Sequence, residues 1–145
     1  MTPIATILVA TDFSPDGNNA VWRAALLARQ LDADLRLMHV VHTAGFKPLR
    51  HWLLRPIDID LETAQARATL RQLGAEIAGR HDVAATVEVR VGDPHDELPR
   101  ASAQADLLVL GQRGRSPFKS LVLGGTADHM LRTSRTPVLV VKRKP

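Results

Sequence analysis

The sequence has no cysteine, few aromatic residues and no long apolar run. Without cysteine there are no disulfides, no thiolate metal site and no cysteine nucleophile, which fits a reducing cytoplasm. Aromatic residues make up 3% of the chain, and proteins that bind RNA or single strands usually interleave more of them with basic residues. No apolar run approaches the roughly 18 residues of a membrane span. We therefore expect a cytoplasmic protein that binds neither nucleic acid nor membranes.

What is present has the character of a globular protein. The chain has 145 residues and is 45% hydrophobic, the size and composition of one domain, residues 1–145, with a real core. Its first twelve residues lack a basic segment and end on Asp12, which is typical of a first strand rather than a signal peptide. The net charge of +4 is scattered, and a small anionic ligand explains the basic residues around Arg113 at least as well as nucleic acid does.

Hydrophobic patterns predict strands and helices in alternation along the chain. Short β-branched runs indicate strands, and apolar residues at helical spacing indicate helices. The expected strands are Ile4–Ala10, Leu35–Val41, Val83–Val91, Asp106–Leu110 and Pro137–Val141. The expected helices are Pro15–Leu31, Asp58–Arg80, Pro94 to about Gln104 with Pro99 kinking it or shortening its regular part, and Thr126–Ser134. This order predicts an α/β fold with an open, mostly parallel sheet and helices on both faces.

A glycine-rich loop follows the fourth expected strand. Gly111 and Gly114 lie near its beginning, and Gly124, Gly125 and Thr126 open the last helix. Glycine permits positive φ angles and a close approach of the backbone to a ligand, and the free N–H groups of a helix start suit a phosphate. Thr126 either caps the helix or offers its hydroxyl to the ligand. Tight turns explain each glycine alone, but the whole arrangement favours a phosphate site.

Other candidate residues follow the first and second strands, because open parallel sheets bind ligands beyond the carboxyl ends of their strands. Thr11 and Asp12 follow the first strand, and Asp12 either binds a ligand or caps the first helix. Arg113 and Arg115 either clamp phosphates or are solvated loop charges. We expect a packing role for His39, and the histidine spacing indicates no metal ligand.

The chain as a whole resembles the universal stress protein family. The resemblance lies in the segments ILVATDFS, LMHVV, GDP, ADLLVLGQRGRS and TPVLVVK. Nucleotide-binding members carry Gly-x2-Gly-x9-Gly followed by Ser or Thr, which this chain matches at Gly111, Gly114 and Gly124. It departs at Gly125, since the hydroxyl arrives one residue later. The resemblance implies a Rossmann-like, adenine-nucleotide hydrolase-like sheet of five strands in the order 3-2-1-4-5.

The same resemblance implies an ATP site and a homodimer. It places Asp12 near the ribose and adenine, Val40 beside the base, and Gly111, Gly114 and Gly124–Thr126 at the phosphates. Mg²⁺ would then be bound through the nucleotide, since no acidic cluster is visible to hold it alone. The last strand, Val138–Val141, is an apolar edge that pairing with a second copy would cover. The alternative for that edge is protection by the following lysines and arginine alone.

Three functions agree with the sequence. The leading one is a regulatory, dimeric ATP-binding stress protein, at most a slow ATPase, because no nucleophile–base pair is evident. The alternatives are a dimeric interaction module without nucleotide and an enzyme on the adenine-nucleotide hydrolase scaffold. A dinucleotide-binding domain is excluded because it needs glycines after the first strand. The long connection His42–Ile57 either serves the site or is a surface crossover.

Overall fold

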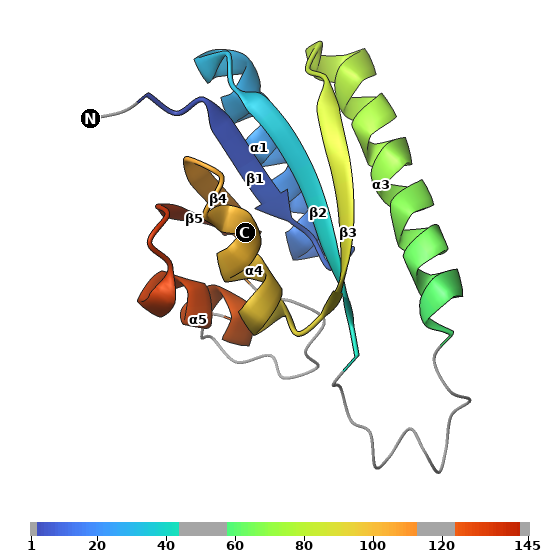
Figure 1. Cartoon of the computed structure of the whole chain (residues 1–145). Helices are drawn as coiled ribbons and strands as arrows, with labels where there is room; N and C mark the ends of the chain where they lie inside the picture. Colours follow the sequence, from blue (N-terminus) through green and yellow to red (C-terminus); the bar gives the residue numbers. More distant parts are fainter. Residues whose placement is uncertain (1–2, 44–57, 113–123, 143–145) are drawn as a thin grey trace.

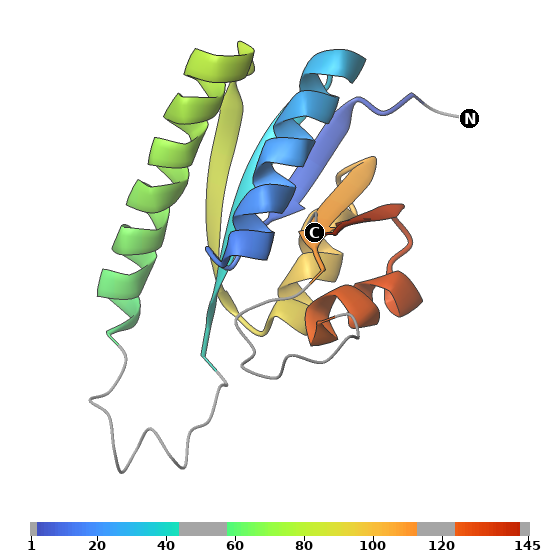
Figure 2. The same ribbon diagram turned by 180° about the vertical axis from the view of Figure 1, so that it is seen from behind.

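The computed structural model describes residues 3–43, 58–112 and 124–142, which form a five-stranded parallel sheet with helices on both faces (Figures 1 and 2). The strands are β1 (Thr6–Ala10), β2 (Asp34–His42), β3 (Ala85–Gly92), β4 (Leu107–Gly111) and β5 (Val138–Val141). The helices are α1 (Pro15–Leu31), α3 (Ile59–His81), α4 (Pro94–Ser102) and α5 (Gly125–Thr133). The strand order β3-β2-β1-β4-β5 confirms the expected topology. All four strand pairs are parallel, whereas the sequence predicted a mostly parallel sheet.

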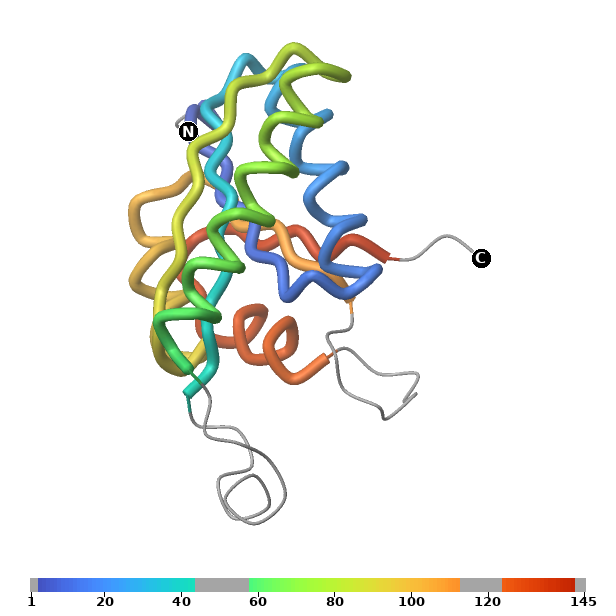
Figure 3. The backbone as a smooth tube through the Cα atoms, turned by 90° about the vertical axis from the view of Figure 1, so that its right-hand side faces the viewer, coloured from blue at the N-terminus to red at the C-terminus, as the bar shows by residue number. Residues whose placement is uncertain are grey.

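The sheet separates two apolar cores. Ile7 and Val9 of β1 face the layer of α1 and α3, whereas Leu8 between them faces α4 and α5. All three are fully buried. This is why strands in the centre of the sheet read as unbroken apolar runs instead of alternating ones. The view along the sheet edge shows α1 and α3 together on one side of it and α4 on the other (Figure 3).

Short polar side chains start three of the four helices. The Ser14 hydroxyl accepts a hydrogen bond from the Gly17 N–H at 3.1 Å, and Asp58 accepts one from Leu61 at 3.1 Å. Asp93 accepts from the His95 N–H at 2.8 Å and precedes Pro94 at the first helical position. These contacts satisfy N–H groups that have no partner within the helix. The expected helix starts at Ser14–Pro15 and Asp93–Pro94 are confirmed.

Several boundaries differ from expectation by one or two residues. Strand β1 begins at Thr6 rather than Ile4, because the Asp106 carboxylate accepts the N–H groups of both Ala5 and Thr6 at 2.9 Å. Helix α5 begins at Gly125 with Gly124 as its N-cap, so Thr126 is not the capping residue. Within the described ranges, no helix is long and apolar enough to cross a membrane.

Candidate functional site

A cleft of about 490 Å³ lies at the carboxyl ends of the central strands. Its lining comes from the ends of β1, β2 and β4, the first turns of α4 and α5, and single residues of α1 and α3. Strand β1 pairs with β2 on one side and with β4 on the other, so the chain reverses its winding direction here. Open α/β sheets bind ligands at such a reversal.

Every predicted site residue within the described ranges lines this cleft. They are Thr11, Asp12, Val40, Gly111, Gly124, Gly125 and Thr126. The other predicted residues, Arg113, Gly114 and Arg115, lie outside the described residues, as does most of the connection His42–Ile57. Segments far apart in the sequence therefore meet at one place, and the part that each residue takes in binding stays a prediction.

The turn after β1 gives Asp12 a defined geometry. One carboxylate oxygen of Asp12 accepts the Ser14 N–H at 2.9 Å, and the Thr11 hydroxyl accepts the Phe13 N–H at 3.0 Å. Between them Phe13 has φ 64°, a left-handed conformation that is unusual for a bulky residue. Ser14, and not Asp12, caps helix α1. The carboxylate of Asp12 is thus held in the cleft wall by the turn that it stabilises.

Two glycines allow α1 to start in contact with the ends of β1 and β4. A Cβ added to Gly111 would lie 2.6 Å from the Asp16 carbonyl oxygen, and one on Gly17 would lie 2.7 Å from both Thr11 Oγ1 and Asp12 Oδ1. Close packing therefore explains Gly111. The expected positive φ at Gly111 is wrong, since Gly92, with φ 153°, is the only glycine with a positive φ in the described ranges. The need for glycine at position 17 was not predicted from the sequence, although a glycine within a helix costs about 1 kcal/mol relative to alanine and could have indicated it.

The start of α5 lies at the cleft. Its N-cap, Gly124, makes no side-chain capping hydrogen bond, and Gly124, Gly125 and Thr126 all line the cleft. The first N–H groups of a helix have no intrahelical partner and carry the positive end of the helix dipole. The Gly124 N–H donates to the Gln112 carbonyl at 2.7 Å, which brings α5 beside the end of β4. This arrangement suits an anionic group such as a phosphate.

Apolar and aromatic groups line another part of the cleft. Val40, Leu98 and Leu110 contribute aliphatic surface. His39 donates from Nδ1 to the Thr11 carbonyl oxygen at 2.7 Å, because a carbonyl can only accept, and its ring stacks on Phe13 with centroids 4.4 Å apart. These contacts confirm the packing role expected for His39, which also lines the cleft.

The structure adds cleft residues that the sequence did not indicate. His95, in the first turn of α4, lines the cleft and stacks on His129 of α5. Glu62 of α3 also lines it. No periodicity or motif signals these residues, because their meeting depends on how α3 and α4 dock. Among the described residues, no group of three or more histidine, aspartate or glutamate side chains could hold a metal ion.

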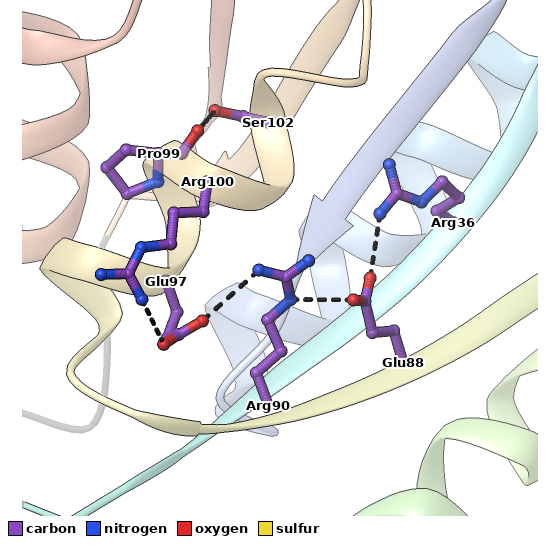
Figure 4. A network of polar contacts seen from close by, with 7 residues as sticks. All are labelled: Arg36, Glu88, Arg90, Glu97, Pro99, Arg100 and Ser102. Atoms are coloured by element: carbon purple, nitrogen blue, oxygen red, sulfur yellow. Dashed lines mark hydrogen bonds and ion pairs between the residues drawn. The ribbon is translucent and has the colours of Figure 1, made fainter.

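An ion-pair network fixes α4 against the sheet (Figure 4). Glu88 of β3 binds Arg36 at 2.9 Å and Arg90 at 2.8 Å, and Arg90 also reaches Glu97 of α4 at 3.4 Å. Glu97 binds Arg100 at 3.2 Å. Burial alone would raise the pKa of Glu88, but the hydrogen bonds from Arg90 and Arg36 outweigh it, so the pKa lies below its ordinary 4.5. The network thereby positions the first turn of α4, which carries His95.

The fold and the cleft together define a doubly wound α/β protein with a cleft where the strand order reverses. The sequence model of the Universal stress protein family matches residues 3–142. The chain belongs to the universal stress protein family.

Individual relatives resemble the chain over nearly its whole length. Universal stress protein MJ0531 of Methanocaldococcus jannaschii is 26% identical over 94% of this chain and 81% of its own length. The structure of MJ0577 from the same organism superposes with a TM-score of 0.81 at 24% identity, covering 99% of each chain. A universal stress protein solved in complex with cAMP has a TM-score of 0.69 at 26% identity and covers 97% of this chain and 98% of its own.

Proposed function

We propose that the cleft binds an adenine nucleotide, ATP with Mg²⁺ carried on its phosphates, and that the protein is a dimeric regulator of the stress response. The observation that carries the proposal is the start of α5, whose N-cap is a glycine without a capping side chain and whose first residues line a cleft that also has an aliphatic wall. A nucleotide needs both kinds of surface, an anion site for phosphate and an apolar one for the base.

Each part of the cleft has a matching part of the ligand. The amides of Gly125 and Thr126 would hold phosphate oxygens, Val40 would contact the base, and Asp12 would accept hydrogen bonds from ribose hydroxyls or the adenine amino group. The related protein solved with cAMP supports an adenine nucleotide as the ligand class. The proposal assigns no catalytic residue, because no nucleophile–base pair is evident in the sequence, so hydrolysis would be slow at most.

The test is a calorimetric titration of nucleotide-free protein with MgATP, in the wild type and two variants at Gly125. A Cβ at Gly125 meets nothing within 4 Å, so a side chain can start from this position without a clash at its first atom. Gly125→Glu adds a carboxylate at the first helical position, which favours the helix by about 0.3–1 kcal/mol but repels phosphate. Gly125→Gln adds the same bulk without the charge.

We expect saturable binding near one ATP per chain in the wild type. Gly125→Glu should abolish it while melting at the same or a higher temperature, and Gly125→Gln should retain more of it. Equal binding by the wild type and Gly125→Glu would mean that the phosphates do not bind at the start of α5. Absence of binding by the wild type would favour the interaction module without nucleotide.

Dimerisation is proposed through strand β5, which lies at one edge of the sheet. Leu139 in this strand is 36% exposed, and pairing with a second copy would cover both the side chain and the strand edge. Leu139→Lys places a charge in that contact without disturbing the core. Light scattering should give twice the chain mass for the wild type and the single mass for the variant. A wild-type monomer at micromolar concentration would contradict the dimer.

A further inference from the structure

We propose that His95 stacks on the purine base of the bound nucleotide and that His129 holds the His95 ring in place for this contact. The inference rests on the proposed function and adds to it the residue that recognises the base. The two imidazole rings are parallel, with centroids 4.2 Å apart and an interplanar angle of 6°. His95 is exposed and lines the cleft, whereas His129 is half-buried on α5.

The position of His95 is fixed before any ligand binds. Its N–H donates to the Asp93 side chain at 2.8 Å, and Pro94 restricts the backbone just before it. The Arg90–Glu97 ion pair ties the same helical turn to β3. Stacking on His129 then selects the ring orientation. Because these constraints are met on folding, a base that stacks on His95 orders little more of the protein, which favours affinity.

The other aromatic rings among the described lining residues of the cleft are the imidazoles of His39 and His42. None of its described lining residues is phenylalanine, tyrosine or tryptophan. One face of His39 already stacks on Phe13. An imidazole is flat and presents a π-face, and bases stack on such faces without needing a particular hydrogen-bond pattern. Val40 and Leu98 supply aliphatic contact in the same cleft.

The charge around His95 favours a base over a phosphate. Its helix begins with Asp93, and the first turn also carries Asp96 and Glu97. Glu97 is paired with arginines, but the carboxylates of Asp93 and Asp96 add negative potential at this end of α4. The first turn of α5 has one acidic residue, Asp128, which is paired with Arg132. A nucleotide with its phosphates at α5 and its uncharged base at His95 matches both helix starts.

The experiment compares MgATP with magnesium tripolyphosphate, which has the phosphates but no base. Both are titrated into the wild type, His95→Ala, His95→Phe and the remote control His81→Ala. We expect His95→Ala to bind MgATP about tenfold more weakly, the loss typical of one base–aromatic stack. His95→Phe should restore the affinity because it keeps a flat ring, and tripolyphosphate affinity should be the same in all four proteins.

The outcomes separate this inference from the proposed function. If the wild type binds MgATP and His95→Ala binds it equally well, the stacking inference is wrong and nucleotide binding stands. If His95→Ala loses affinity for MgATP and tripolyphosphate alike, His95 acts on the phosphates and the stacking assignment is wrong. If His95→Phe fails to restore MgATP binding, a flat ring is not what the site needs, and the assignment is wrong as well. A wild type that binds neither ligand overturns both proposals.

Discussion

Gly111 provides the sharpest test of what the glycines of this site do. In Gly111→Ala the new Cβ would lie 2.6 Å from the Asp16 carbonyl oxygen, 2.7 Å from its carbon and 3.0 Å from the Gly17 nitrogen. All three are backbone atoms, so either α1 or the end of β4 must shift. Overpacking of this kind costs typically 1–3 kcal/mol, and the smaller entropy of the unfolded alanine chain returns about 0.4–1 kcal/mol. We expect a net loss of about 1–2 kcal/mol in the free energy of unfolding.

The assay is urea unfolding followed by circular dichroism, with Gly125→Ala as the matched control. An added Cβ at Gly125 meets nothing within 4 Å and the residue is helical, so this variant should gain about 0.5 kcal/mol. Both glycines line the cleft, yet the structure predicts opposite signs. If Gly111→Ala unfolds at the same urea concentration as the wild type, close packing does not explain the glycine at position 111. Close approach to a ligand would then be the remaining explanation for it.

Three further changes test the fold around the cleft. Ser14→Ala removes the N-cap of α1 and should cost about 1 kcal/mol in urea unfolding, whereas an unchanged midpoint would contradict the capping role. Glu88 has a lowered pKa, so its contribution is full above pH 4.5 and is lost as the pH falls through the lower folded value. The stability advantage of the wild type over Glu88→Gln should therefore shrink below pH 4.5, and a pH-independent difference would exclude this cause. Ile77→Ala leaves a cavity at a fully buried site and should lower the free energy of unfolding by about 2–5 kcal/mol. Leu61→Ala, at a position 53% exposed, should lower it little, and equal losses would contradict the assigned core.

The order of the elements could be read from the sequence because each signal is local. The run from Ile7 to Val9 is apolar since both of its faces are buried, and Ser14–Pro15 marks a helix start through a hydroxyl and a missing N–H. The exact ends depend on tertiary contacts. Asp106, for example, accepts the N–H groups of Ala5 and Thr6 at the start of β1 from 101 and 100 positions later in the chain, and no local pattern reveals that.

The candidate site divides in the same way. Residues directly after strands, such as Asp12, and the glycines before α5 could be predicted because the carboxyl ends of parallel strands share one edge. The expected positive φ at Gly111 was wrong, and the need for glycine there comes from α1 packing against it. His95 and His129 are 34 positions apart and meet only through the docking of α4 on α5, so no sequence pattern announces them.

The most direct test of nucleotide binding in this cleft is a titration of ¹⁵N-labelled protein with MgATP, followed by NMR. We expect the amide resonances of Gly124, Gly125 and Thr126 to move and saturate together with those near Asp12. The amide resonances of Asp32 and Asp82, the C-caps of α1 and α3 near the amino ends of the strands, should not shift. Shifts confined to other surfaces, or no saturable shift at all, would contradict a nucleotide site at the start of α5.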